Sequence, residues 1–99
     1  MPPVTGIFRA GATDIPVHTI WSLHTELAAI GLPVRGTEVS STPSFGTDTQ
    51  TRVRDFQKLY HLPETGDLDP VTGGVMSLAS LVATQTDRAQ LRAAFQLSA

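Results

Sequence analysis

One short pattern occurs twice along the chain at the same spacing. The first copy comprises Phe45, Gly46, Thr49 and Val53, and the second, 23 positions later, comprises Leu68, Asp69, Thr72 and Met76. Each copy has an apolar residue, a helix-capping residue, a threonine at the third helical position and a further apolar residue. The apolar residue before a cap packs on the first turns, while capping groups satisfy N–H groups that lack partners. The pattern predicts two helices side by side, with Phe45 and Leu68 anchored in one shared interior.

A first helix is expected before this repeat. Asp14 is its predicted N-cap, Pro16 is tolerated in its first turn, and Gly31 ends it. Its apolar face recurs at helical spacing and comprises Val17, Ile20, Leu23, Leu27 and Ile30.

The second helix is expected to begin near Gly46 or Thr47 and to end around Tyr60 or His61, because Pro63 disfavours the helical conformation just before it. Asp48 lies in its first turn, where a negative charge favours the helix dipole. Val53 and Phe56 form its core stripe, with Leu59 beside it.

The third helix is predicted from Pro70, capped by Asp69, to about Ser80. It is expected to bury Val75, Met76 and either Leu78 or Ala79, although Gly73 and Gly74 weaken it intrinsically. Thr86 or Asp87 is predicted to cap a separate last helix that ends near Leu97, with Leu91 and Phe95 facing inward.

Two segments are expected to lie outside the helices. Residues 1–14 contain several Pro and Gly residues and are predicted to be a flexible N-terminal arm, which leaves 15–99 as a single helical domain. Residues 33–44 form a loop that is longer than usual, and such loops often have functions. The expected buried residues around this loop are Leu32, Val34 and Val39.

Composition excludes several function classes. The chain is 40% hydrophobic and 16% charged, which is typical of a globular domain. Its net charge of −2, without a Lys/Arg cluster, argues against a nucleic-acid partner. It has no cysteine, and no apolar run approaches the roughly 20 residues of a membrane span. The first residues lack the order of a secretory signal, so any export signal is expected to lie elsewhere.

The stretch from about Val17 to Leu81 resembles the peptidoglycan-binding-like domain family. The residues that carry the resemblance are Leu23, Leu27, Gly31, Phe45, Gly46, Thr49, Val53, Phe56, Gln57, Leu62, Thr65, Gly66, Leu68, Asp69 and Thr72. The resemblance implies an all-α three-helix bundle, here with an additional C-terminal helix and a long loop between the first two helices. It also implies a non-catalytic module without a cofactor, which binds bacterial cell-wall peptidoglycan and targets a larger protein to the cell envelope or the secreted space.

Three positions depart from the family pattern. His24 stands where the family usually has Gln, Thr42-Pro43-Ser44 replaces an Asp-Gly pair, and His61 replaces a Gly. That glycine typically adopts the left-handed conformation at a helix C-terminus. These changes favour the alternative hypothesis of a degenerate member that acts as a structural or protein–protein interaction domain in an exported protein or toxin. An exposed apolar strip would support this alternative, whereas a polar groove would support a glycan binder.

Four residues are candidates for ligand binding. Ser44 and Thr47 flank the start of the second helix, whose free N–H groups could accept a stem-peptide carboxylate; Arg35 could pair with the same carboxylate. Tyr60 could stack on a sugar ring, or it could simply cover the 33–44 loop. We expect a shallow groove between this loop, the start of the second helix and Tyr60, which would accept either glycan or stem peptide.

The remaining polar and aromatic residues have structural interpretations. The amide of Gln57 is expected to tie the second helix to loop backbone, and Trp21 to lie at the core edge. His18, His24 and His61 lack the spacing and the acidic partners of a metal site. Glu26, Glu38 and Glu64 show no spacing that demands a catalytic pair, so catalysis is not expected.

Overall fold

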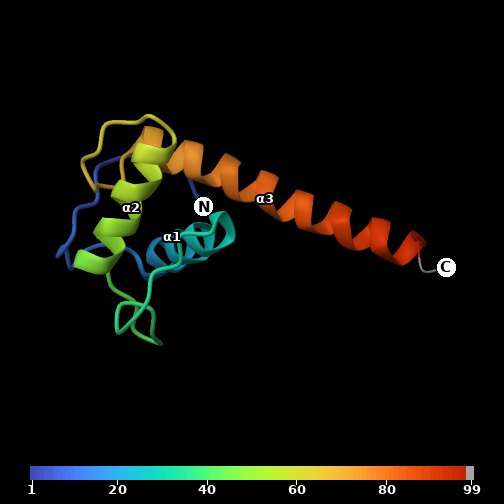
Figure 1. Ribbon diagram of the computed structural model, residues 1–99. Coiled ribbons are helices and arrows are strands. Elements are labelled where there is room, and N and C mark those ends of the chain that lie inside the picture. The colour runs from blue at the N-terminus through green and yellow to red at the C-terminus, as the bar shows by residue number, and fades with distance from the viewer. Residues whose placement is uncertain (98–99) are drawn as a thin grey trace.

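The computed structural model describes the backbone of residues 1–97 and the side chains of residues 1–85. The helices are α1 (Val17–Ile30), α2 (Thr47–Leu59) and α3 (Pro70–Leu97), and Figure 1 shows α1 and α2 gathered against the first part of α3. Within residues 1–97 no strand forms; the nearest feature is an isolated antiparallel bridge between Phe8 and Leu68. The fold is therefore all-α with three helices, as predicted.

The C-terminal part of this prediction is wrong, because no separate last helix exists within residues 1–97. The backbone continues helically from Pro70 to Leu97, and Figure 1 shows α3 extending well beyond the other two helices. No Gly or Pro occurs after Gly74 in this stretch, which is rich in good helix formers, so nothing interrupts the helix near Ser80. The predicted inward positions of Leu91 and Phe95 lie outside the described side chains.

Both predicted anchors are buried. Phe45 is 2% exposed and Leu68 is fully buried. They lie in one core with residues from all three helices, among them Leu23, Leu27, Val53, Phe56 and Met76. Burial of this size stabilises a fold by roughly 1.5–3 kcal/mol for each large apolar side chain, so the two anchors hold the starts of α2 and α3 against α1.

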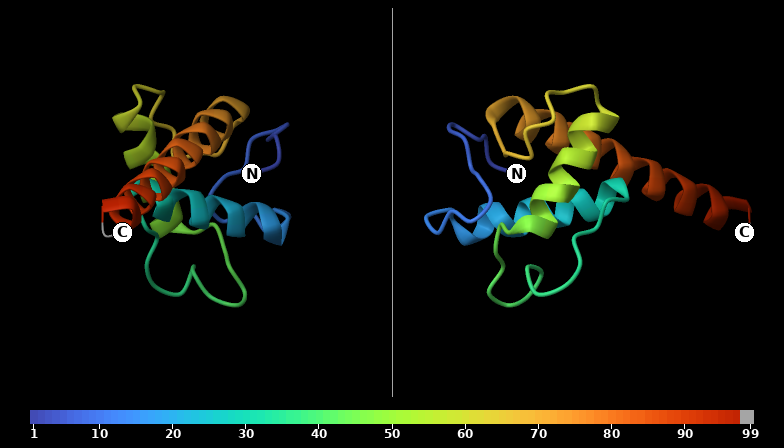
Figure 2. Two further views of the ribbon diagram at one scale, coloured as in Figure 1. Left: turned by 90° about the vertical axis from the view of Figure 1, so that its right-hand side faces the viewer. Right: turned by 60° about the vertical axis from the view of Figure 1, so that its left-hand side comes forward.

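The N-terminal segment joins the two anchors through their backbones. Phe8 and Leu68 exchange N–H···O=C hydrogen bonds of 2.9 Å in both directions, and the Gly11 N–H donates to the Phe45 carbonyl at 2.8 Å. Val4 is buried over Gly73, where an added Cβ would lie only 2.8 Å from a Val4 methyl group. Figure 2 shows this segment running beside the bundle. The flexibility of residues 1–14 and the domain boundary at residue 15 stay predictions.

Helices α1 and α2 end in the left-handed backbone conformations expected from the sequence, but the predicted side-chain cap of α1 does not form. Asp14 does not cap α1; Pro16 occupies the N-cap position and no side chain caps it. At the other end Gly31 has a φ of 94°, the left-handed conformation expected there. His61 adopts the same region after α2 with a φ of 58°. It therefore takes the conformation of the family's glycine, at a cost of roughly 1–2 kcal/mol.

Four apolar side chains expected near the core are exposed, namely Val17, Val39, Leu59 and Leu78. Val17 and Leu59 lie at the first turn of α1 and the last turn of α2, where the packed part of each helix ends. In α3 the buried residue is Met76, with Val75 and Ala79 partly buried, so Leu78 lies on the outer side. The long loop buries Glu38 in place of Val39.

Candidate functional site

A carboxylate from the long loop caps the N-terminus of α2. Glu38 Oε1 accepts the N–H groups of Gly46 and Thr49, both at 2.8 Å, and Oε2 accepts the N–H of Asp48 at 2.9 Å. The Thr49 hydroxyl also donates to Oε1, at 2.7 Å. The loop is closed at its base by a 3.1 Å hydrogen bond from the Ser44 N–H to the Glu38 carbonyl. Glu38 therefore occupies the donors that the sequence suggested for a ligand carboxylate.

Gly46 is required by this cap for reasons of space. Its φ of −107° is available to any residue, so the backbone conformation does not demand glycine. A Cβ at this position would lie 2.7 Å from the Glu38 carboxyl carbon and one of its oxygens. Because a glycine cannot cap a helix with a side chain, the chain supplies the acceptor from eight residues upstream.

His24 of α1 extends the same network through Thr49. The His24 Nε2 and the Thr49 hydroxyl oxygen lie 2.9 Å apart. The single hydroxyl proton of Thr49 is directed to the carboxylate of Glu38, which can only accept. His24 must then donate from Nε2, which assigns its neutral form to the Nε2–H tautomer.

The protonation of both ionisable groups follows from this environment. Burial lowers the pKa of His24, and the opposing effects of the Glu38 carboxylate and the Ser44 backbone are smaller. Burial raises the pKa of Glu38, but the hydrogen bonds from Thr49, Asp48 and Gly46 together outweigh it and leave the pKa below its usual value. The network is thus a neutral imidazole, a hydroxyl and a charged carboxylate.

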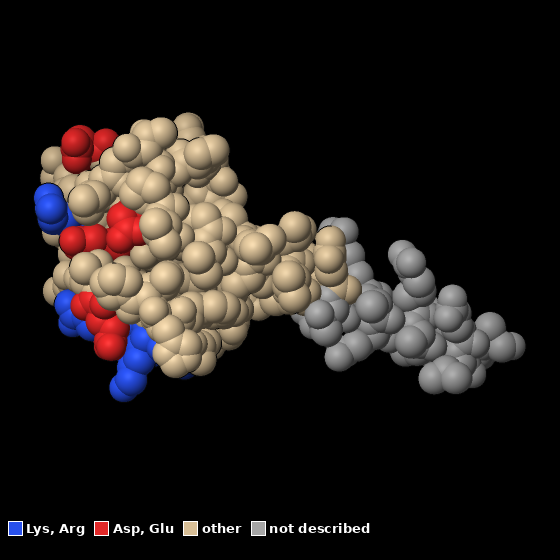
Figure 3. All heavy atoms as spheres, turned by 90° about the horizontal axis from the view of Figure 1, so that it is seen from above, with Lys and Arg blue, Asp and Glu red and all other residues tan. Residues whose placement is uncertain are grey.

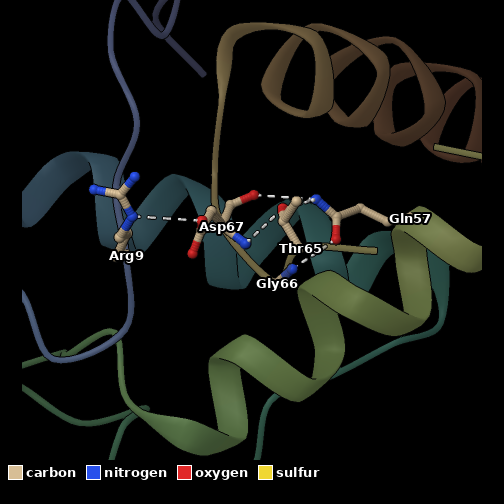
Figure 4. Close-up of polar contacts among 5 residues, drawn as sticks. All are labelled: Arg9, Gln57, Thr65, Gly66 and Asp67. Atoms are coloured by element: carbon tan, nitrogen blue, oxygen red, sulfur yellow. Dashed lines mark hydrogen bonds and ion pairs between the residues drawn. The ribbon is translucent and has the colours of Figure 1, made fainter. Parts of the chain in front are cut away.

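Gln57 makes an equivalent connection between α2 and α3. Its Nε2 lies 3.1 Å from each of three acceptors, the Thr65 hydroxyl, the Asp67 carbonyl and the Thr72 hydroxyl. Its Oε1 accepts the Gly66 N–H at 2.8 Å. Figure 4 shows the amide directed into the turn, with Arg9 of the N-terminal segment reaching Asp67 on the other side, 3.6 Å away.

The two copies of the sequence pattern therefore share a tertiary contact. In each, the threonine at the third helical position bonds a side chain of the preceding helix: His24 contacts Thr49, and Gln57 contacts Thr72. The threonine hydroxyls thus link neighbouring helices, whereas the sequence suggested that they satisfy free N–H groups. The Asp69 cap is as predicted, since its carboxylate accepts the Thr72 N–H at 2.7 Å. His24 thus makes in the first copy the contact that Gln57 makes in the second.

The predicted ligand residues lie in two separate places. Arg35 lines a hollow of about 160 Å³ with Asp48, Thr51 and Arg52, at the start of α2. Ser44 and Thr47 are exposed near that end of the helix. Tyr60 follows the last residue of α2, and a helix of 13 residues separates it from Thr47 by about 20 Å. The single groove expected from the sequence does not form.

Tyr60 borders an apolar surface of α3. Its ring centroid lies 4.6 Å from that of Phe56, and it lines a hollow of about 390 Å³ with Val75, Leu78, Ala79 and Val82. A larger hollow, of about 720 Å³, lies between α1 and α3 beside the exposed indole of Trp21. Trp21 is 55% exposed, so it is not the core-edge residue that the sequence suggested.

Sequence reasoning missed three residues at these surfaces: Glu38, Arg52 and Trp21. A signal existed for Glu38, because the N-cap glycine of α2 has no side chain and Glu38 is the only acidic residue of the 33–44 loop. For Trp21 a signal also existed, because it lies outside the apolar face of the first helix, whereas nothing in the local sequence places Arg52 beside Arg35. Among the described residues, no cluster of three His, Asp or Glu side chains could hold a metal ion, and none of their helices is long and apolar enough to cross a membrane.

Comparison with known proteins gives one match. Residues 22–76, which include most of α1, all of α2 and the start of α3, match the family model described as "Putative peptidoglycan binding domain". The matched stretch contains both copies of the repeated pattern together with His24, Glu38 and Gln57. Searches of curated proteins and of solved structures found no match.

The close approach of Gly46 and Glu38 gives a double-mutant test. Glu38→Ala should lower the free energy of unfolding by about 2 kcal/mol, because it leaves helix N–H groups without their acceptor. Gly46→Ala should cost roughly 1–3 kcal/mol through the clash with the carboxylate. In the Glu38→Ala background the clash is absent, so most of the second cost should disappear. Urea unfolding of the four proteins measures the coupling, and simple additivity would contradict this account of Gly46.

The pKa shifts of His24 and Glu38 predict that acid destabilises the fold. Both pKa values are lower in the folded state, so the unfolded chain binds more protons. The free energy of unfolding therefore decreases as the pH is lowered. The His24 contribution should be lost from about pH 6.5 downward, and that of Glu38 from about pH 4.3 downward. Chemical unfolding across this range measures both. His24→Gln, which copies the residue at position 57, should flatten the upper part of the profile only, and Glu38→Gln the lower part. Parallel profiles for the three proteins would refute the assignment.

Proposed function

Because the chain belongs to the peptidoglycan-binding domain family, we propose that it is a non-catalytic module that attaches to the bacterial cell wall. The observation that carries this proposal is the family match over residues 22–76, which spans the anchors and the contacts that hold the three helices together. A module of this kind would work at the cell envelope or outside the cell. The matched family is a binding domain alone, which supports a function in attachment without catalysis.

The hollow at the start of α2 is the best candidate for stem-peptide contact. Stem peptides carry carboxylates, and guanidinium groups bind carboxylates through two parallel hydrogen bonds. The hollow offers Arg35, which is exposed, and Arg52, whose side chain is 40% exposed and pairs with Asp55 at 3.1 Å. Since Glu38 already fills the N–H donors of α2, a ligand carboxylate would pair with these arginines. Ser44 and Thr47 would supply hydroxyl contacts from the rim.

Tyr60 would act separately from these residues. Its distance along α2 removes it from a ligand held by Arg35, and the side chains around its own hollow are apolar. A glycan needs hydrogen-bonding partners as well as a ring to stack on, so Tyr60 is the weaker member of the predicted set.

A second candidate function, that of a protein-interaction domain, is favoured by one observation. Tyr60 lines an apolar hollow with Val75, Leu78, Ala79 and Val82 of α3, in which the side chain of Leu78 is 65% exposed. Contiguous exposed apolar surface is typical of protein contacts. This function would bring another domain of an exported protein against α3, and Leu78→Lys would then abolish that association in ultracentrifugation while leaving wall binding unchanged.

Sedimentation with purified sacculi tests wall attachment directly. The wild-type protein should pellet with peptidoglycan in a saturable manner, and Arg35→Ala should weaken retention by roughly tenfold through loss of the carboxylate contact. Arg9→Ala is the matched control, because Arg9 is also exposed, does not line the hollow, and its replacement removes the same charge. Absence of the wild-type protein from the pellet at high concentration would refute wall binding. Equal losses for both variants would indicate a general charge effect and exclude the hollow.

A further inference from the structure

The groove between α1 and α3 has mostly apolar walls that also carry hydroxyl groups, a surface suited to an uncharged ligand with both apolar and polar faces. Its volume is about 720 Å³, and its walls carry Trp21, Ser22 and Thr25 from α1 and Ser77, Ser80 and Thr84 from α3. It lies between α1 and α3, whose courses Figures 1 and 2 show. We call it the α1–α3 groove.

Trp21 gives this groove an aromatic platform. Tryptophan is highly buried on average, yet this indole is 55% exposed and lines the groove. An indole face presents a large, rigid apolar area with a polar N–H at its edge. Such a surface complements the apolar face of a sugar ring, whose hydroxyl groups point outward from the edge and need polar partners.

Hydroxyl groups surround that platform. Ser80 donates to the Ser77 carbonyl at 2.9 Å and lies 3.4 Å from Glu26 Oε1, and Thr84 donates to the Ser80 carbonyl at 2.9 Å, so these two hydroxyls on the groove wall can offer a ligand their oxygens as acceptors. Within residues 1–85 the hydroxyls of Ser22 and Thr25 make no hydrogen bond. A ligand rich in hydroxyl and amide groups would therefore find both donors and acceptors along the walls.

The groove lacks the positively charged side chains that an anionic peptide would need, so an uncharged ligand fits it better. Residues 70–85 contain no Lys, Arg, Asp or Glu, and Glu26 is the only such residue of α1. The Glu26 carboxylate is 10% exposed and pairs with the amino group of Met1 at 3.1 Å. Figure 3 shows the visible charged side chains at the end of the bundle away from the projecting part of α3. A stem peptide would find no Lys or Arg side chain on these two helix walls.

We infer that the α1–α3 groove binds the glycan strand of peptidoglycan, with an N-acetylated sugar ring stacked on Trp21. This inference rests on the proposed wall-binding function and assigns its glycan contact to a surface distinct from Arg35 and from Tyr60. The groove would bind the sugar polymer, and the hollow at the start of α2 would bind the peptide.

Trp21 is the only tryptophan in the chain, so its fluorescence reports on this groove alone. Titration of the wild-type protein with a β-1,4-linked N-acetylglucosamine tetramer should change the emission in a saturable manner, whereas an isolated stem tripeptide should not. A change that depends on protein concentration without sugar would mean that the groove joins two copies of the chain, and would overturn the inference.

Retention on glycan strands that have been stripped of stem peptides provides the matched test. Trp21→Ala should weaken retention by roughly tenfold or more, and Thr25→Glu, a change at an exposed position on the groove wall, should also weaken it. Leu59→Ala is the control, since Leu59 is 61% exposed and lies outside the groove. Circular dichroism would verify that each variant is folded.

The outcomes separate this inference from wall binding itself. If the wild-type protein binds intact sacculi but not stripped strands, or if Trp21→Ala and Thr25→Glu bind stripped strands normally, the glycan site is refuted while wall attachment stands. If the wild-type protein binds neither material, both proposals fall. Loss of stripped-strand binding in the two groove variants, with Leu59→Ala and Arg35→Ala unaffected, is the expected result.

Discussion

The arrangement of the first two helices depends on the hydrogen bonds that the Glu38 carboxylate accepts. It gathers three backbone N–H groups and one hydroxyl at the start of α2, and through Thr49 it reaches His24 on α1. A buried carboxylate is tolerated only when hydrogen bonds compensate its lost hydration. These donors meet that condition, and in return the long loop is held against the bundle. The loop therefore has a structural reason for its length, because it must bring an acceptor to a helix whose own cap is a glycine.

The same design recurs between α2 and α3 with different chemistry. There the cap is local, since Asp69 accepts from Thr72, and the connection between helices is the amide of Gln57. An amide both donates and accepts, so one side chain bonds the turn at Gly66 and the next helix at Thr72. The N-terminal segment then joins the two copies by pairing with the backbones of Leu68 and Phe45. Three polar connections thus set the positions of helices that the apolar core alone would hold less specifically.

This arrangement leaves most of the polar motif unavailable to a ligand. Thr49, Gln57 and Thr72 are buried; Thr49 bonds His24 of α1, and Gln57 bonds Thr72 of α3, so residues that identify the family hold the fold together. A ligand must therefore bind to the surfaces that surround these buried residues. The surfaces differ in chemistry: two arginines near the start of α2, an apolar hollow beside Tyr60, and a hydroxyl-rich groove beside Trp21. Each surface suits a different kind of partner, and peptidoglycan contains both a sugar polymer and a charged peptide.

The sequence by itself determined the three helices, the approximate limits of α1 and α2, the start of α3 and the two anchors. Those features depend on neighbours within a few residues, such as the periodicity of apolar positions, a proline after Leu62 or an aspartate before Pro70. It also predicted a break in α3 that does not occur, because a possible cap at Thr86 or Asp87 cannot end a helix that no Gly or Pro interrupts. Only the tertiary structure decided that Glu38 would fill the start of α2, that Tyr60 and Arg35 would lie at opposite ends of one helix, and that Trp21 would line a groove between α1 and α3. These outcomes depend on how a long loop closes and how two helices diverge, and contacts between residues far apart in the chain leave no local pattern in the sequence.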